Sequence, residues 1–198
     1  MSNDLAALIG SRICHDLISP IGAIGNGVEL LSLTAQETAG SPEFALINES
    51  VENANARIRF FRIAFGAASA NHTIGSAEVR SVLTAMQQGG RLTYDWQATT
   101  DQSRADVRIV FLLLQCIETA LPLGGDVAIQ MVDTSWHITA TGRRIDIDED
   151  LWNGLAAPDA TVSHTAAQVQ FALLPHALRA AGKPLDMQHT DDSLSLRF

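Results

Sequence analysis

Between residues 44 and 65, apolar side chains recur at alternating spacings of three and four with no polar interruption. They are Phe44, Ile47, Val51, Ala54, Ile58, Phe61 and Phe65. This period places one apolar stripe along a helix that packs lengthwise against other helices. Ser41 and Pro42 precede the stripe as a helix start, a capping residue followed by proline at the first helical position.

A second apolar stripe lies upstream and predicts an earlier helix. Its members are Ile13, Leu17, Ile24, Val28 and Leu31. A loop at Gly40 and Ser41 then joins the two helices into a hairpin. One hairpin covers its own stripes only in part, whereas two hairpins from two chains bury both in a four-helix bundle. We therefore expect a homodimer.

The remainder of the chain alternates helical and strand patterns. The expected elements are helix 77–88, strand 91–97, helix 104–121, strands 126–133 and 136–141, helix 164–181, and strands 184–189 and 193–198. Turn residues at 133–135 and 191–192 predict two strand hairpins. The segment 69–76 is the expected linker, which gives a helical domain over 1–72 and a second domain over 73–198. The predicted fold class is α+β: a helical hairpin forming a dimeric four-helix bundle, followed by an α/β sandwich.

The charge balance bounds the possible partners. The 13 Lys and Arg are scattered among 22 Asp and Glu, for a formal charge of −9, which argues against binding to nucleic acid or an anionic membrane. Cys14 and Cys116 lack the spacing of a redox or metal motif, as expected in a reducing compartment. Because the N-terminus has no leader pattern and no apolar run reaches about 18 residues, we expect a cytoplasmic protein.

His15 is the residue that points to chemistry. On a helical wheel it lies opposite the stripe of the first helix, so its ring should face solvent. The face around it carries small, polar and apolar residues, a mixture that suits docking by another protein. These candidate partner-binding residues are Leu8, Ser11, Arg12, Ile18, Gly22 and Asn26.

A solvent-facing imidazole can act as a phosphoacceptor. The neutral ring is a nucleophile at physiological pH, and it can hold a phosphoryl group as a covalent intermediate. The adjacent Asp16 can orient the ring or accept its other N–H proton. Ser19, one turn on, can hydrogen-bond the phosphate, and Pro20 should bend the helix just after the site. A lone surface histidine is usually only solvated, so the interpretation depends on the whole string from His15 to Pro20.

The string His-Asp-Leu-Ile-Ser-Pro over 15–20 resembles the phosphoacceptor box of sensor histidine kinases. The wider segment 11–24 resembles the ChpT-type histidine phosphotransferases of bacterial phosphorelays. This resemblance implies a dimer with a kinase-like fold that does not bind ATP. It further implies that His15 takes phosphate from a receiver-domain aspartate of a hybrid kinase and passes it to another response regulator. The receiver would supply Mg²⁺, so this chain would need no cofactor or metal. Kinases usually have Thr or Asn where Ser19 stands, and that position supports dephosphorylation of the partner.

The C-terminal region separates a phosphotransferase from a kinase. Kinase domains of this type need an Asn-bearing helix for magnesium and glycine-rich turns that let the backbone approach the phosphates. The segment 110–120 contains no Asn, only Gln115 and Glu118 as polar candidates, and 161–168 contains no glycine. ATP binding is therefore not expected. Two alternatives stay open: an ATP-dependent histidine kinase with a divergent pocket, and a non-catalytic scaffold that binds receivers.

Other polar and aromatic residues have simpler interpretations. The remaining histidines, at 72, 137, 164, 176 and 189, show no metal-ligand spacing. The acidic cluster at 146–150 reads as a solvated helix start. The tryptophans at 96, 136 and 152 are expected in the core or in loops.

Overall fold

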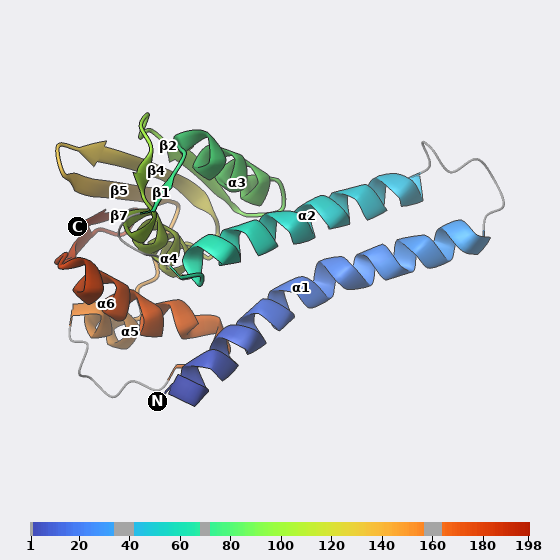
Figure 1. The fold of residues 1–198 in the computed structure, drawn as a ribbon, viewed down its shortest axis with the longest axis horizontal. Coiled ribbons are helices and arrows are strands. Elements are labelled where there is room, and N and C mark those ends of the chain that lie inside the picture. The colour runs from blue at the N-terminus through green and yellow to red at the C-terminus, as the bar shows by residue number, and fades with distance from the viewer. Residues whose placement is uncertain (1, 34–41, 68–71, 157–163) are drawn as a thin grey trace.

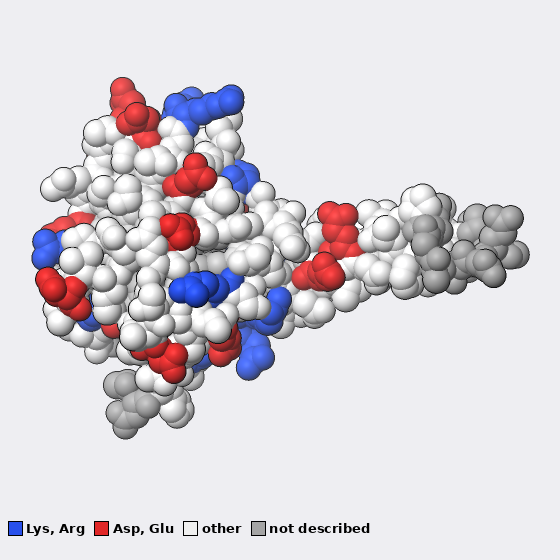
Figure 2. Space-filling view, turned by 90° about the horizontal axis from the view of Figure 1, so that it is seen from above, with Lys and Arg blue, Asp and Glu red and all other residues white. Residues whose placement is uncertain are grey.

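The computed structural model describes residues 2–33, 42–67, 72–156 and 164–198. Two long helices, α1 (Ser2–Leu33) and α2 (Pro42–Ala64), form an antiparallel hairpin that projects from a globular α/β part (Figures 1 and 2). The hairpin confirms the two predicted helices. The expected cap at Ser41 and the loop before it lie outside the described residues.

The apolar stripe of α2 divides between two surroundings. Ala54 and Phe61 are buried, and Ile47 is partly covered. In contrast, Phe44, Val51 and Ile58, which follow one another at intervals of seven, remain 38–43% exposed. Helix α1 has a similar stripe, because Ile21 and Val28 are more than half exposed. Both helices of the hairpin therefore leave large apolar side chains exposed to solvent.

Helix α1 runs without interruption through Pro20. In Figure 1 its axis changes direction near the middle of the helix, the region where Pro20 lies. A proline within a helix removes one backbone hydrogen bond and crowds the preceding turn, so a bend here agrees with the sequence-based expectation.

A five-stranded mixed sheet forms one layer of the α/β part, in the order β2-β4-β5-β7-β6. Its strands are β2 (Leu92–Trp96), β4 (Gly125–Val132), β5 (Ser135–Gly142), β6 (Asp186–His189) and β7 (Ser193–Arg197). Only β2 and β4 are parallel. The β4–β5 hairpin turns at Asp133, whose φ of 55° belongs to the left-handed region that Asp tolerates better than most residues.

The helices of this part are α3 (Ser76–Gln88), α4 (Arg104–Ala120), α5 (Glu149–Ala156) and α6 (Val169–Ala181), with a short 3₁₀ helix η1 (Ala166–Gln168) before α6. Buried residues of α3, α4 and α6 join those of the sheet in one core cluster. Helix α4 is buried at every position from Ile109 to Ile117. All three tryptophans are buried as well, as predicted.

The hairpin is anchored to this core through the end of α2. Phe60 packs on Phe111 of α4 with ring centroids 4.6 Å apart. Arg104 and Arg108, on the first turns of α4, donate hydrogen bonds to backbone carbonyls at and beyond the end of α2, including that of Ala64. These carbonyls have no partner within the helix, and guanidinium groups satisfy them. Burial, with the nearby Arg104 charge as the lesser cause, lowers the pKa of Arg108.

The predicted α+β class and all the predicted long elements are confirmed, with ends shifted by a few residues. The structure adds α5, η1 and a two-stranded sheet of β1 (Thr73–Ile74) and β3 (Gln102–Ser103). The end of the proposed linker is therefore part of a strand pair. The acidic cluster does begin a helix, because Asp148 accepts a hydrogen bond from the Leu151 N–H at the start of α5. The division at residue 72 stays a prediction. No helix in the described part of the chain is long and apolar enough to cross a membrane.

Candidate phosphoacceptor site

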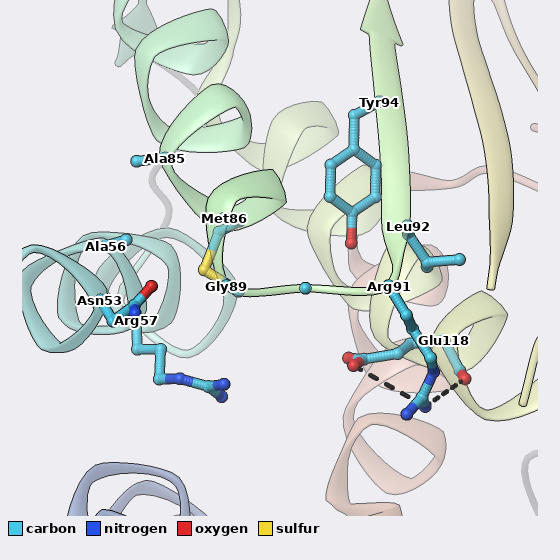
Figure 3. Close-up of a pocket in the computed structure, with 11 residues that line it drawn as sticks. Asn53, Ala56, Arg57, Ala85, Met86, Gly89, Arg91, Leu92, Tyr94 and Glu118 are labelled. Atoms are coloured by element: carbon cyan, nitrogen blue, oxygen red, sulfur yellow. Dashed lines mark hydrogen bonds and ion pairs between the residues drawn. The ribbon is translucent and has the colours of Figure 1, made fainter. Parts of the chain in front are cut away.

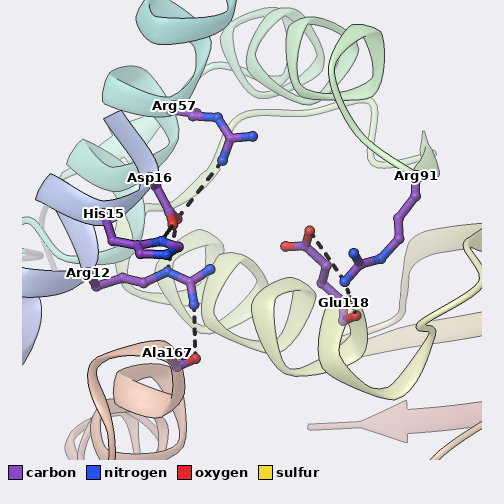
Figure 4. A network of polar contacts seen from close by, with 7 residues as sticks. All are labelled: Arg12, His15, Asp16, Arg57, Arg91, Glu118 and Ala167. Carbon is purple, nitrogen blue, oxygen red and sulfur yellow. Dashed lines mark hydrogen bonds and ion pairs between the residues drawn. The ribbon is translucent and has the colours of Figure 1, made fainter. Parts of the chain in front are cut away.

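His15 lies on α1 with its side chain 86% exposed, as the helical wheel predicted. Its Nδ1 lies 3.0 Å from Oδ1 of Asp16 (Figure 4). A proton on Nδ1 makes this contact a hydrogen bond, and the neutral ring then keeps an unprotonated Nε2. The carboxylate thus fixes which nitrogen is free to act as a nucleophile.

Asp16 is itself held from two sides. Its side chain is only 10% exposed, and Arg12, one turn earlier, donates from Nε to Oδ2 at 2.9 Å. Arg57 reaches across from α2, with Nη1 3.9 Å from the same oxygen. One carboxylate oxygen of Asp16 therefore accepts from Arg12, while the other oxygen faces the ring of His15.

Arg12 also connects α1 to the α/β part. Its Nη1 donates a hydrogen bond to the backbone carbonyl of Ala167, in η1, at 2.9 Å. The guanidinium group therefore bridges Asp16 and a segment more than 150 positions away in sequence. The orientation of the α/β part and the orientation of Asp16 are linked through one side chain.

A cavity of about 360 Å³ opens beside His15. Asp16, Ser19 and Pro20 line it from α1, and Asn53 and Arg57 line it from α2. Gly89, just after α3, closes the side nearest the α/β part. The cavity is large enough for a phosphoryl group and places polar side chains from both helices around it.

A second cavity, of about 300 Å³, is also lined by Arg57 (Figure 3). Arg91, Tyr94 and Glu118 line it, and Arg57 and Asn53 border both cavities. The Arg91 and Glu118 side chains form an ion pair at 3.8 Å. Burial, and then the Glu118 carboxylate, raise the pKa of Tyr94, so its phenol stays protonated.

The predicted partner-binding residues divide into two groups. Ser11, Ile18, Gly22 and Asn26 are exposed on the same side of α1 as His15, and Ile18 is 69% exposed. Leu8 is partly buried and packs against the core, and Arg12 makes the internal contacts described above. The structure brings His15, Asp16 and Ser19 together at one cavity. The roles of all these residues stay predictions.

Sequence reasoning missed Arg57 and Asn53. Both lie on α2, and only the packing of the hairpin brings them opposite Asp16 and Ser19. No motif marks either residue. Among the residues that the structure describes, no group of three or more His, Cys, Asp or Glu side chains could hold a metal ion.

An exposed histidine whose ring contacts a carboxylate, on a helical hairpin attached to an α/β domain, is the arrangement that the sequence predicts for a phosphoacceptor protein. Residues 76–193 match the family described as histidine phosphotransferase C-terminal domain. The protein phosphotransferase ChpT of Brucella abortus (strain 2308) is 37% identical over 182 residues, which cover 86% of this chain and 84% of that protein.

A solved structure of a phosphotransferase gives the same result. A structure described as a bacterial phosphotransferase at 1.7 Å superposes with a TM-score of 0.80 at 31% identity, covering all of this chain and 96% of that one. The histidine kinase AdeS of Acinetobacter baumannii gives a TM-score of 0.42 at 14% identity, over 93% of this chain and 96% of the kinase. This chain belongs to the histidine phosphotransferase family. Members of this class are protein phosphotransferases of phosphorelay signalling.

Proposed function

We propose that His15 accepts a phosphoryl group from a receiver-domain aspartate of a hybrid kinase and passes it to an aspartate of another response regulator. One observation carries this proposal: the ring is exposed, and its Nδ1 is held by Asp16. A receiver can therefore approach Nε2 while the rest of the site stays fixed within the chain.

The transfer needs no change in the bonds of this chain other than at Nε2. The Nε2 lone pair attacks phosphorus, the N–P bond forms, and the P–O bond to the receiver's aspartate breaks as the carboxylate leaves with its electron pair. The ring gains positive charge, and its Nδ1 proton stays directed at Asp16 Oδ1. The carboxylate stabilises that charge as the third member of a catalytic triad does. The reverse sequence delivers the group to a second receiver, and the Mg²⁺ that such transfers use would be held by the receiver.

We further propose that the α/β part helps to hold the receiver and does not bind ATP. Helix α4, whose counterpart in kinases would carry the magnesium-binding asparagine, is buried from Ile109 to Ile117. It packs against α2 and α6, and Gln115 and Glu118 line cavities between α2 and the α/β part. This arrangement supports a binding role for the domain.

The functional unit in this proposal is a homodimer. The exposed apolar side chains of α1 and α2 include Ile21, Val28, Val51 and Ile58. A second hairpin would cover them and complete a four-helix bundle. We place the protein in the cytoplasm, because Cys14 and Cys116 are both free thiols and receivers are cytoplasmic.

Single-turnover transfer tests the proposal. A purified receiver, labelled at its aspartate, is mixed with the wild-type chain and with His15→Ala. We expect label on the wild-type chain within the mixing time and none on the variant, while both remain dimers of the same size. Label on the variant at the wild-type rate would contradict the proposal.

The same proteins separate the two alternatives. An ATP-dependent kinase would label itself at His15 when incubated with labelled ATP and Mg²⁺, and we expect no such label. A scaffold would bind receivers equally well with and without His15 and would carry no phosphate in either case.

A further inference from the structure

Arg57 stands where three cavities meet. It lines the cavity of His15, the cavity of Arg91 and Glu118, and a small cavity of about 20 Å³ that Arg12 and Gln115 also line. The side chain comes from α2, so it approaches the site from the helix that does not carry the acceptor. Figure 3 shows its guanidinium group directed away from the axis of α2.

The guanidinium group of Arg57 is only weakly engaged. Its Nη1 lies 3.9 Å from Asp16 Oδ2, beyond hydrogen-bond distance, whereas Arg12 already donates to that oxygen at 2.9 Å. Within the described part of the chain, no other charged partner or hydrogen bond is found for Arg57. Asp16 is therefore paired with Arg12 alone at close range, and the N–H donors of Arg57 are available to another anion.

The local charge favours an incoming phosphoryl group. Arg12 and Arg57 together carry two positive charges against the one negative charge of Asp16, in a chain whose formal charge is −9. A phosphoryl group brings about two negative charges near neutral pH. Guanidinium groups bind phosphate oxygens in a two-pronged geometry that an ammonium group does not match.

We propose that Arg57 binds the phosphoryl oxygens during transfer to and from His15, turning from Asp16 to the phosphate. This inference rests on the proposed function. As the P–O bond of the aspartyl phosphate breaks and the N–P bond forms, the guanidinium group stabilises the negative charge on the three non-bridging oxygens. The guanidinium group transfers no proton and forms no covalent bond. It acts as a preorganised charge supplied by the second helix of the hairpin.

The test compares Arg57→Gln with wild-type protein in two reactions. One is single-turnover transfer from a labelled receiver, and the other is direct phosphorylation of His15 by phosphoramidate, which involves no receiver. Removal of one preorganised donor lowers the rate of a reaction by about a hundredfold to a thousandfold in comparable sites. Because this site is open to water, the effect here should be smaller, and we expect the rates of both reactions to fall by at least about tenfold in Arg57→Gln. The rates of Arg57→Lys should fall less.

Arg59→Gln is the matched control. Arg59 lies two residues further along α2, is exposed, and directs Nη1 toward Ser81 of α3. The two variants change the charge of the same helix equally, but only Arg57 borders the cavity of His15. Both reactions should proceed at the wild-type rate in the control.

A pH titration of the phosphorylated protein by ³¹P NMR distinguishes phosphate binding from a structural role. A cation beside the phosphoryl group lowers its pKa, so Arg57→Gln should raise the pKa of phosphohistidine, and Arg57→Lys should leave it closer to wild type. The proposal is overturned by wild-type rates or an unchanged titration in Arg57→Gln. If Arg57→Gln loses the dimer, the rates and titration of Arg57→Lys decide in its place. Label on His15→Ala would instead refute the proposed function itself.

Discussion

Arg12 donates a hydrogen bond from Nη1 to the carbonyl of Ala167 at 2.9 Å, across a sequence separation of 155 residues. The same guanidinium group holds Asp16 through Nε. A displacement of η1 relative to α1 would therefore pull on the carboxylate that orients the acceptor ring. Contact between a receiver and the α/β part can in this way change the orientation of the His15 ring.

Replacement of Arg12 by alanine should affect the chain before any receiver binds. We expect faster amide exchange in η1 and the first turn of α6, a loss of about 1 kcal/mol in the free energy of unfolding, and slower phosphotransfer. Hydrogen exchange followed by mass spectrometry measures the first effect. Arg144→Ala, which removes an exposed pair with Asp146, is the control. If Arg12 served only in docking, receiver affinity would fall while exchange in η1 stayed unchanged.

Asp16→Asn retains an oxygen that can accept from Nδ1 but removes the charge that stabilises the phosphorylated ring. The amide can also turn its NH₂ toward Nδ1, which would leave the proton on Nε2 and block attack. We expect single-turnover transfer to slow by roughly a hundredfold. Glu52→Gln, an exposed site on α2, should transfer normally. A change of less than about twofold in Asp16→Asn would show that the contact at 3.0 Å has no role in the reaction.

The exposure of His15 and the two hairpin helices could be predicted because the helical period alone fixes which residues share a face. The wheel could not predict the position of Arg12. Its backbone lies near the face of His15, but its long side chain reaches sideways to Asp16 and Ala167. That contact depends on how α6 packs against α1, which no local pattern encodes.

Arg57 illustrates the same limit for the site. Its placement opposite Asp16 follows from the register of the α1–α2 hairpin, and its relation to Arg91 and Glu118 follows from the docking of the α/β part. Strands β1 and β3 have only two residues each, too few to show a period of two. Their pairing is a tertiary contact, so the sequence pattern reads as a linker.

A pair of charges on the uncovered stripe of α2 should break the proposed dimer. Val51 and Ile58 are 38% and 43% exposed and lie one heptad apart, so both would be buried by a second hairpin. Val51→Asp combined with Ile58→Asp would place unpaired carboxylates there, at a cost of several kcal/mol. Sedimentation should report a monomer with an unchanged circular dichroism spectrum. Ala45→Asp adds a charge at an exposed position of the same helix, about 120° around the helix axis from Val51, and should remain dimeric. A double variant that sediments as a dimer would place the interface elsewhere.

Cys116 predicts how stability changes with pH. Its thiol is fully buried in α4, and burial raises its pKa well above the ordinary value. Above about pH 8.5, the ordinary pKa of a thiol, the unfolded chain loses this proton while the folded chain keeps it. The folded state then binds more protons than the unfolded state, so the free energy of unfolding must fall as pH rises.

Urea unfolding between about pH 8 and pH 9.5 measures this slope, in a range below the ordinary pKa of tyrosine. We expect stability to decline in wild type and in Cys14→Ala, whose thiol is exposed. Cys116→Ala should be less stable at every pH because it leaves a cavity, but its decline with pH should be shallower. A thiol reagent should likewise label Cys14 in the folded protein and Cys116 only after unfolding. Equal slopes in the wild type and Cys116→Ala would mean that Cys116 does not remain protonated in the folded core.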